Sequence, residues 1–139
     1  MHTKSLIAGL FLILFGFHAA QSQSCQVSSC PQPSGTPDYV YPGNPPSNNV
    51  HSGELFIIES GTYSDFTNIL PNATVWIKPG ASWMLNGPVS SMKGTLIIEG
   101  TMELTGFGNV SNPLSEVYVC NGGTLIIPNG LTPKFNFTV

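Results

Sequence analysis

Two short strand-like runs, divided by one glycine and bounded by two more, make up Gly94-Thr95-Leu96-Ile97-Ile98-Glu99-Gly100-Thr101-Met102-Glu103-Leu104-Thr105-Gly106. Every second side chain in each run is apolar, which is the period of a β-strand with one buried face. A glycine at the junction permits the positive φ that a tight corner requires. The stretch therefore predicts two strands joined by a sharp corner.

The same pattern recurs before and after this stretch. The apolar residues that open the four first runs are separated by 20, 21 and 21 residues: Leu55, Val75, Leu96 and Val117. With the residue two positions on, each forms an inward aliphatic pair: Leu55/Ile57, Val75/Ile77, Leu96/Ile98 and Val117/Val119. The second runs add Trp83/Leu85, Met102/Leu104 and Leu125/Ile127. Steps of near-constant length are typical of solenoids, whose stacked coils bury a face that one coil cannot bury alone.

No segment has the 3.6-residue period of a crossover helix, so the parallel strands must be connected without helices. The sequence therefore predicts an all-β fold, a short single-stranded parallel β-helix of about four coils. A small antiparallel sandwich of hairpins is the alternative, because its short strands look similar locally. Hairpins, however, do not predict the constant step.

Residues 1–22 have the order of a secretory signal peptide. His2 and Lys4 precede an apolar run over residues 6–17, and small residues follow, so cleavage after Ala20 or Ser22 is expected. The apolar run is too short for a comfortable membrane span. We therefore expect a secreted or cell-surface protein with no transmembrane segment in the mature chain.

Residues 23–52 are expected to form a Cys-containing, Pro-rich linker or cap before a repeat domain over residues 53–139. Cys25 and Cys30 lie five residues apart, and in an oxidising compartment they would close a local disulfide that leaves Cys120 over. Proline disfavours a central strand, so this segment is interpreted as extended chain or as a wrap over the first coil, anchored by Tyr39-Val40-Tyr41. With no second cysteine pair or nearby histidine, no metal site is expected.

The charge of the mature chain argues against several partners. Three lysines stand against seven acidic residues after the signal peptide, which gives −4, and the sequence has no arginine. Nucleic-acid binding needs clustered Lys and Arg, and so does attraction to an anionic membrane surface. We expect neither partner, and no cofactor.

The glycine-punctuated runs over residues 94–100 and 123–130 resemble the repeats of secreted bacterial right-handed β-helix proteins, which are common among surface proteins of the Bacteroidetes. The resemblance covers about residues 53–130 and implies a structural or adhesive role. Such proteins are often long, and many end in a separate sorting domain. This chain ends in an alternating strand over residues 134–139, which is expected either to close the coil or to mark the front part of a longer protein.

Many β-helix proteins of this kind degrade polysaccharides, so the resemblance also raises the possibility of catalysis. A glycosidase needs two carboxylates facing one sugar bond. Glu54 and Glu116 are expected at equivalent positions three coils apart, and Glu99 and Glu103 on successive runs of one coil. His51 is the only histidine left after the signal peptide. We expect no catalytic residues, and we keep a carbohydrate-binding module, or the N-terminal fragment of a polysaccharide-degrading enzyme, as the alternative function.

The outward positions of the first runs supply the candidate ligand-binding residues: Phe56, Trp76, Ile97 and Tyr118. Stacked coils would place them about 4.8 Å apart in one row. An exposed aromatic row suits stacking on sugar rings, so the expected partner is an extracellular glycan or another surface protein. In the competing interpretation the row is covered, by the Pro-rich segment, by the loop over residues 107–114 or by a missing domain.

Overall fold

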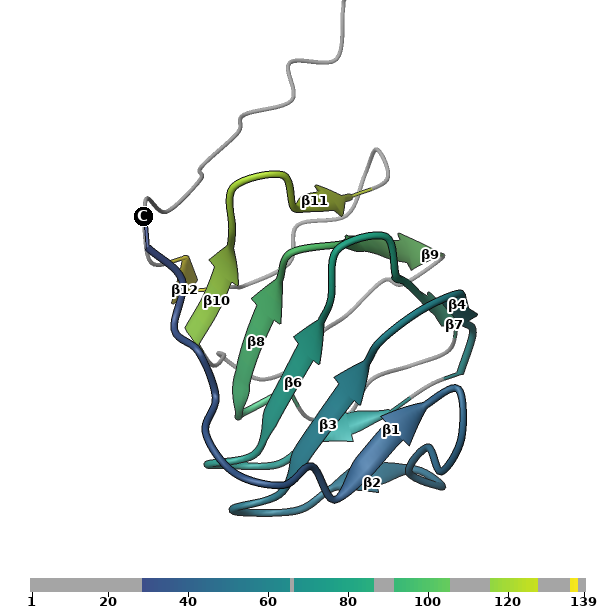
Figure 1. Ribbon diagram of the computed structural model, residues 1–139, viewed down its shortest axis with the longest axis vertical. Helices are drawn as coiled ribbons and strands as arrows, with labels where there is room; N and C mark the ends of the chain where they lie inside the picture. Colours follow the sequence, from purple (N-terminus) through teal and green to yellow (C-terminus); the bar gives the residue numbers. More distant parts are fainter. Residues whose placement is uncertain (1–28, 66, 87–91, 106–115, 128–135, 138–139) are drawn as a thin grey trace, which may run out of the picture.

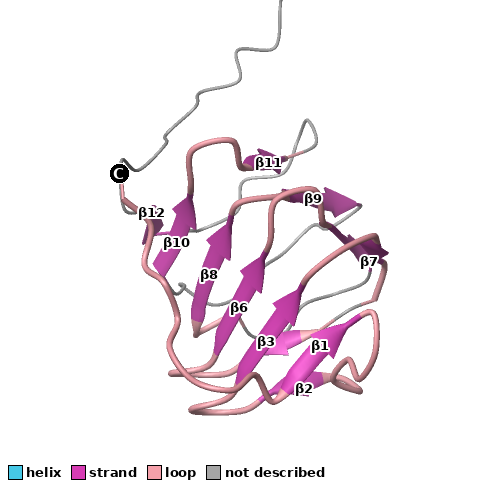
Figure 2. Cartoon of the chain, in the orientation of Figure 1, coloured by secondary structure: helices cyan, strands magenta, loops and turns pink. Residues whose placement is uncertain are grey.

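The chain folds into a parallel β-solenoid of about four turns (Figure 1). The structure is a computed structural model, and it describes residues 29–65, 67–86, 92–105, 116–127 and 136–137. Within these ranges there are strands, turns and loops but no helix (Figure 2). Every pairing between named strands is parallel. The expected all-β parallel β-helix is therefore confirmed. The predicted signal peptide lies outside the described residues.

Three sheets form the sides of the solenoid. The first sheet consists of β1 (Tyr39–Tyr41), β3 (Leu55–Ile58), β6 (Thr74–Ile77), β8 (Thr95–Ile98), β10 (Glu116–Val119) and β12 (Asn136–Phe137), in that spatial order. The second sheet consists of β4 (Thr62–Tyr63), β7 (Ser82–Asn86), β9 (Thr101–Thr105) and β11 (Thr124–Ile126). The third sheet pairs β2 (Asn49–Val50) with β5 (Asn68–Ile69), and a bridge from Ile69 to Met92 extends it by one coil.

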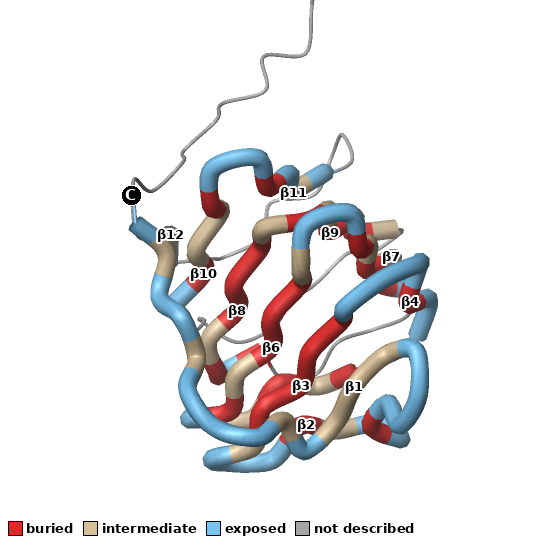
Figure 3. Tube along the Cα trace, viewed as in Figure 1, coloured by how far each residue is buried: buried red, intermediate tan, exposed pale blue. Residues whose placement is uncertain are grey.

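The core fills the space between the three sheets. Figure 3 shows the middle strands of the first sheet as almost wholly buried. Inward side chains of the second sheet meet them, and Trp83, Leu85, Met102 and Leu104 are buried as expected. Leu125 is half-buried, whereas Ile127 is 37% exposed and does not join the core. The apolar stacks of successive coils therefore form one continuous core.

The expected register is confirmed for the coils of β6, β8 and β10 and is wrong for the coil of β3. Val75 pairs with Leu96, and Leu96 pairs with Val117, as the 21-residue steps predict. The residue opposite Val75 on β3 is Phe56, not Leu55. All four residues of β3 are apolar, so its alternation does not say which face is inside, and a shift of one residue exchanges the two faces.

The solenoid begins before residue 53, because the Pro-rich segment supplies its first coil. Tyr39 and Tyr41 pair with Phe56 and Ile58. The far edge of β1 is closed by two backbone hydrogen bonds between Val40 and Asn44, of 2.8 and 3.1 Å. Proline disfavours a central strand, but β1 is an edge strand, and the neighbouring Pro37 and Pro42 are tolerated at such an edge. The segment therefore caps the N-terminal end of the stack.

Glycines at the corners between the first and second sheets have two different physical roles. Gly80 has a φ of 80°, the left-handed conformation expected of a tight corner. Gly100 is not required for its φ. A Cβ atom at Gly100 would lie 2.3 Å from the Ala81 carbonyl oxygen and 2.4 Å from that of Lys78, both on the preceding coil. Gly100 is therefore required by the close approach of two stacked corners.

Candidate functional site

The outward face of the first sheet carries an apolar row, here called the outward row, with one residue from each of β3, β6, β8 and β10. Pairing places Ile57, Trp76, Ile97 and Tyr118 side by side on successive strands. Trp76, Ile97 and Tyr118 therefore share one outward row, as the alternation predicts. Phe56 does not, because it lies in the core with no exposed surface and meets the Tyr63 ring edge-on, with the ring centroids 5.2 Å apart.

The outward row is largely buried. Ile57, Trp76 and Ile97 are 7%, 6% and 1% exposed, and Tyr118 is half-buried. They form an apolar cluster of their own, with Leu55, Cys120 and Cys30. A glycan cannot stack on Trp76 in this arrangement, because stacking needs an open ring face. Of the two interpretations of the row, the covered one agrees with these exposures.

The cover includes the segment of residues 29–37, here called the strap. Cys30 on the strap is bonded to Cys120, which directly follows β10, and their Cα atoms are 5.7 Å apart. The expected Cys25–Cys30 disulfide is therefore wrong, and Cys25 itself lies outside the described residues. Closeness in sequence suggested that pair, but the extended strap returns Cys30 to the end of a strand 90 residues away.

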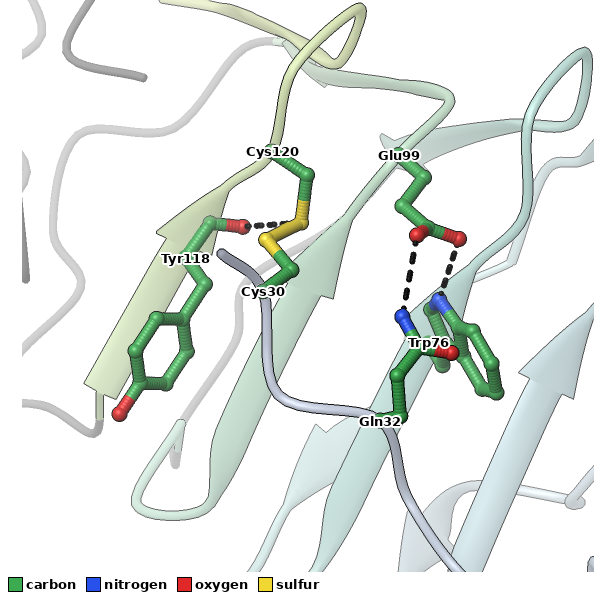
Figure 4. The surroundings of a disulfide bond; sticks show 6 residues. All are labelled: Cys30, Gln32, Trp76, Glu99, Tyr118 and Cys120. Carbon is green, nitrogen blue, oxygen red and sulfur yellow. Dashed lines mark hydrogen bonds between the residues drawn. A yellow bond between two sulfur atoms is a disulfide. The ribbon is translucent and has the colours of Figure 1, made fainter. Parts of the chain in front are cut away.

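Two polar side chains, Glu99 and Lys78, contact Trp76 directly. Its indole N–H donates a 2.9 Å hydrogen bond to Glu99 on the next coil. The Gln32 side chain of the strap donates to the other oxygen of the same carboxylate at 3.4 Å (Figure 4). The Lys78 ammonium lies 3.1 Å from the centroid of the Trp76 ring, a cation–π contact. Glu99 thus joins the outward row to the strap.

Tyr118 is the most open member of the row. Its hydroxyl donates a 2.9 Å hydrogen bond to the exposed Glu116 carboxylate. The Cys120 sulfur lies 3.9 Å from the Tyr118 carbonyl oxygen, the dashed contact in Figure 4. A disulfide sulfur carries no hydrogen, so this is a packing contact. Tyr118 therefore marks the rim of the covered region.

The register does not place Glu54 and Glu116 as a catalytic pair. Glu54 was expected at the position equivalent to Glu116, but the register places Leu55 there. Glu54 accepts hydrogen bonds from the Tyr39 hydroxyl at 3.4 Å and the His51 backbone N–H at 2.7 Å. Burial, followed by the nearby charge of Glu54, raises the pKa of the Tyr39 phenol. Within the described ranges, no three His, Cys, Asp or Glu side chains gather as a metal site would require.

The second sheet presents a different outward face, which the sequence pattern did not reveal. Hydroxyl side chains occupy one register position on four successive strands: Thr62, Ser82, Thr101 and Thr124. Thr62 and Thr124 are exposed and the other two are half-buried. These residues, here called the hydroxyl row, are 20, 19 and 23 residues apart. The corners differ in length, so a search for constant steps misses them.

Comparisons with protein-family models, with curated proteins and with solved structures found no match to this chain. In the part of the chain that the structure describes, no helix has the length and apolar character needed to cross a bilayer.

Proposed function

We propose that this chain is an exported, non-catalytic β-solenoid with a structural or adhesive role at or outside the cell surface. The observation that carries the proposal is the Cys30–Cys120 disulfide, which ties the strap to the end of β10. Such bonds form and persist mainly in oxidising compartments outside the cytosol. The expected signal peptide over residues 1–22 and the resemblance to secreted bacterial β-helix repeats agree with export.

The non-catalytic part of the proposal is supported by the carboxylates. A glycosidase holds two of them free to face the substrate across an open site. Glu99 is engaged by Trp76 and Gln32, and Glu116 by Tyr118. Glu54 is engaged by the backbone of its own loop and by Tyr39. Side chains occupied in this way stabilise the coil and its cover.

A carbohydrate-binding module is the second candidate, and the hydroxyl row is the observation that favours it. Hydroxyl groups repeated about 4.8 Å apart along a sheet can form many weak hydrogen bonds with one polymer. Many weak contacts made together give a strong attachment. Under this candidate, Thr101 and its neighbours would contact the sugar, instead of the row at Trp76.

Export is tested by producing the full chain in a secreting bacterium and measuring the intact mass of the product outside the cytoplasm. We expect a chain that begins at Gln21 or Gln23 and contains one disulfide, which peptide mapping assigns to Cys30 and Cys120. A product that keeps Met1 and remains in the cytoplasm with reduced cysteines would refute the export proposal.

Adhesion is tested by retaining the purified mature protein on chitin, cellulose and a panel of immobilised soluble polysaccharides. If the hydroxyl row binds, Thr62→Lys with Thr124→Lys abolishes retention, because each end of the row then carries a bulky charged side chain in place of a hydroxyl. The matched control is His51→Lys with Ser60→Lys, which places the same charges at exposed positions outside the sheets. Absence of retention of the parent protein on every polysaccharide removes the carbohydrate candidate and leaves the structural role.

A further inference from the structure

The strap is fixed firmly at its two ends and weakly between them. At one end is the Cys30–Cys120 bond. At the other, the Asp38 backbone N–H donates to the Leu55 carbonyl, and the Asp38 carboxylate accepts the Leu55 N–H, both at 2.9 Å. Among the described residues, the interior of the strap adds one side-chain hydrogen bond, from Gln32 to Glu99, which at 3.4 Å is long.

The strap buries little apolar surface of its own. Pro33 and Pro37 are half-buried, while Pro31, Gln32 and the residues 34–36 are exposed. An extended segment with so few buried apolar contacts has a low local stability once its covalent tie is removed. The disulfide is therefore the main attachment of the strap at its Cys30 end.

The core does not depend on this tie. Cys30 and Cys120 belong to the apolar cluster of the outward row. The cluster inside the solenoid, which contains Phe56, Val75 and Trp83, is separate from it. The two clusters lie on opposite faces of the first sheet, so loss of the strap leaves the packing of the coils unchanged.

We propose that the strap is a reducible cover: cleavage of the Cys30–Cys120 bond frees residues 29–37 and exposes the outward row at Trp76 and Ile97, while the coils stay folded. This property goes beyond the proposed structural or adhesive role and does not depend on it. The protein then has a closed form, in which the strap covers the outward row, and an open form, in which the row is exposed.

The chemistry is thiol–disulfide exchange with a small-molecule thiol as reductant. Its thiolate attacks the sulfur of Cys30 in preference to that of Cys120, because the Cys30 residue is half-buried whereas Cys120 is only 3% exposed. The bond to Cys120 breaks, and Cys120 leaves as a thiolate that takes up a proton. A second thiol then resolves the mixed disulfide at Cys30. Two protein thiols form, and two reductant thiols become one disulfide.

The two tryptophans supply the probe. Trp76 lies under the cover, whereas Trp83 lies in the core with no exposed surface and donates to the Asp65 carbonyl at 3.0 Å. The protein is the mature chain with Cys25→Ser, so that only the Cys30 and Cys120 thiols are released. Acrylamide quenching, far-ultraviolet circular dichroism and thiol titration are measured before and after addition of dithiothreitol.

Before reduction we expect almost no quenching. After reduction the quenched fraction rises to about half, because one of the two tryptophans becomes accessible, and the dichroism is unchanged. Reoxidation reverses the effect, and Trp76→Phe abolishes it. The unreduced Cys30→Ser variant, in which only a strap residue changes, shows the open signal from the start.

Two results would overturn the proposal. If both thiols titrate and quenching remains near zero, the strap stays in place without its bond. If the dichroism of the solenoid is lost in the reduced protein and in Cys30→Ser, the bond holds the coils together and is not merely the tie of a cover.

Discussion

Trp76 and Glu99 are diagonal neighbours on adjacent coils, joined by a 2.9 Å hydrogen bond from the indole N–H to the carboxylate. Trp76 is 6% exposed, so its N–H has little access to water and needs this acceptor. In the described part of the chain, every buried side-chain nitrogen and oxygen has a partner. This hydrogen bond therefore gives the buried Trp76 N–H an acceptor on a face of the sheet that is otherwise apolar.

Glu99→Ala is expected to lower the free energy of unfolding by about 1–3 kcal/mol, because the buried indole N–H loses its acceptor. Glu99→Gln keeps an oxygen in place and should cost about 1 kcal/mol or less. Urea denaturation measures both. The control is Glu103→Ala on the second sheet, expected within about 0.5 kcal/mol of the parent. Equal effects of the alanine variants at 99 and 103 would contradict the assigned role of Glu99.

Gly100→Ala is expected to destabilise the protein by about 3 kcal/mol or more, because the new methyl group overlaps two carbonyl oxygens of the preceding corner. Gly80→Ala should cost only about 1–2 kcal/mol, since it suffers the positive φ alone and no atom lies within 4 Å. The unfolding temperatures of the two variants are compared. Gly100→Ala reports the steric overlap between coils, and Gly80→Ala reports the strain of a positive φ. The reverse order would show that the corners are not stacked as closely as described.

Tyr63 is expected to make the protein sensitive to alkali. Burial, with a smaller contribution from the Asp65 charge, raises the pKa of its phenol, although the Thr67 hydrogen bond acts in the opposite direction. The folded chain therefore holds this proton more tightly than the unfolded chain, whose pKa is about 10. The resulting stability is fully present below about pH 10 and is lost as the pH rises towards the folded-state pKa.

The measurement is the free energy of unfolding in urea from about pH 8 to pH 11 for the parent and Tyr63→Phe. At neutral pH the variant should be about 1–3 kcal/mol less stable, because the buried Thr67 hydroxyl loses its 2.8 Å partner. Above pH 10 its curve should fall less steeply than that of the parent. Parallel curves would exclude Tyr63 as the titrating group.

Removal of the first coil is expected to cause aggregation. A chain that begins at Gly53 loses β1 and the Val40–Asn44 hydrogen bonds, which exposes the edge of β3 and the Phe56 ring beneath it. Uncovered edges of this kind pair between molecules. A chain that begins at Asp38 also lacks Cys30 but keeps the cap, and it should remain monomeric. Light scattering of both truncated chains, at equal concentration, distinguishes the loss of the cap from the loss of the disulfide.

The sequence by itself determined the stacking of the coils. Val75, Leu96 and Val117 recur at 21-residue steps and alternate with outward neighbours, and both properties follow from local geometry. A strand presents alternate residues to alternate faces, and a coil of fixed length returns them to the same place. Trp76, Ile97 and Tyr118 could be assigned to one outward row for the same reason.

Only the tertiary structure decided the inner face of β3, the partner of Cys30 and the cover of the outward row. Phe56 and Ile57 are both apolar, so local alternation cannot choose between them, and contacts with Tyr63 and the neighbouring strands make the choice. Cys30 meets Cys120 because an extended strap and a strand end converge across 90 residues. These outcomes depend on contacts between residues distant along the chain, and local periodicity does not encode such contacts.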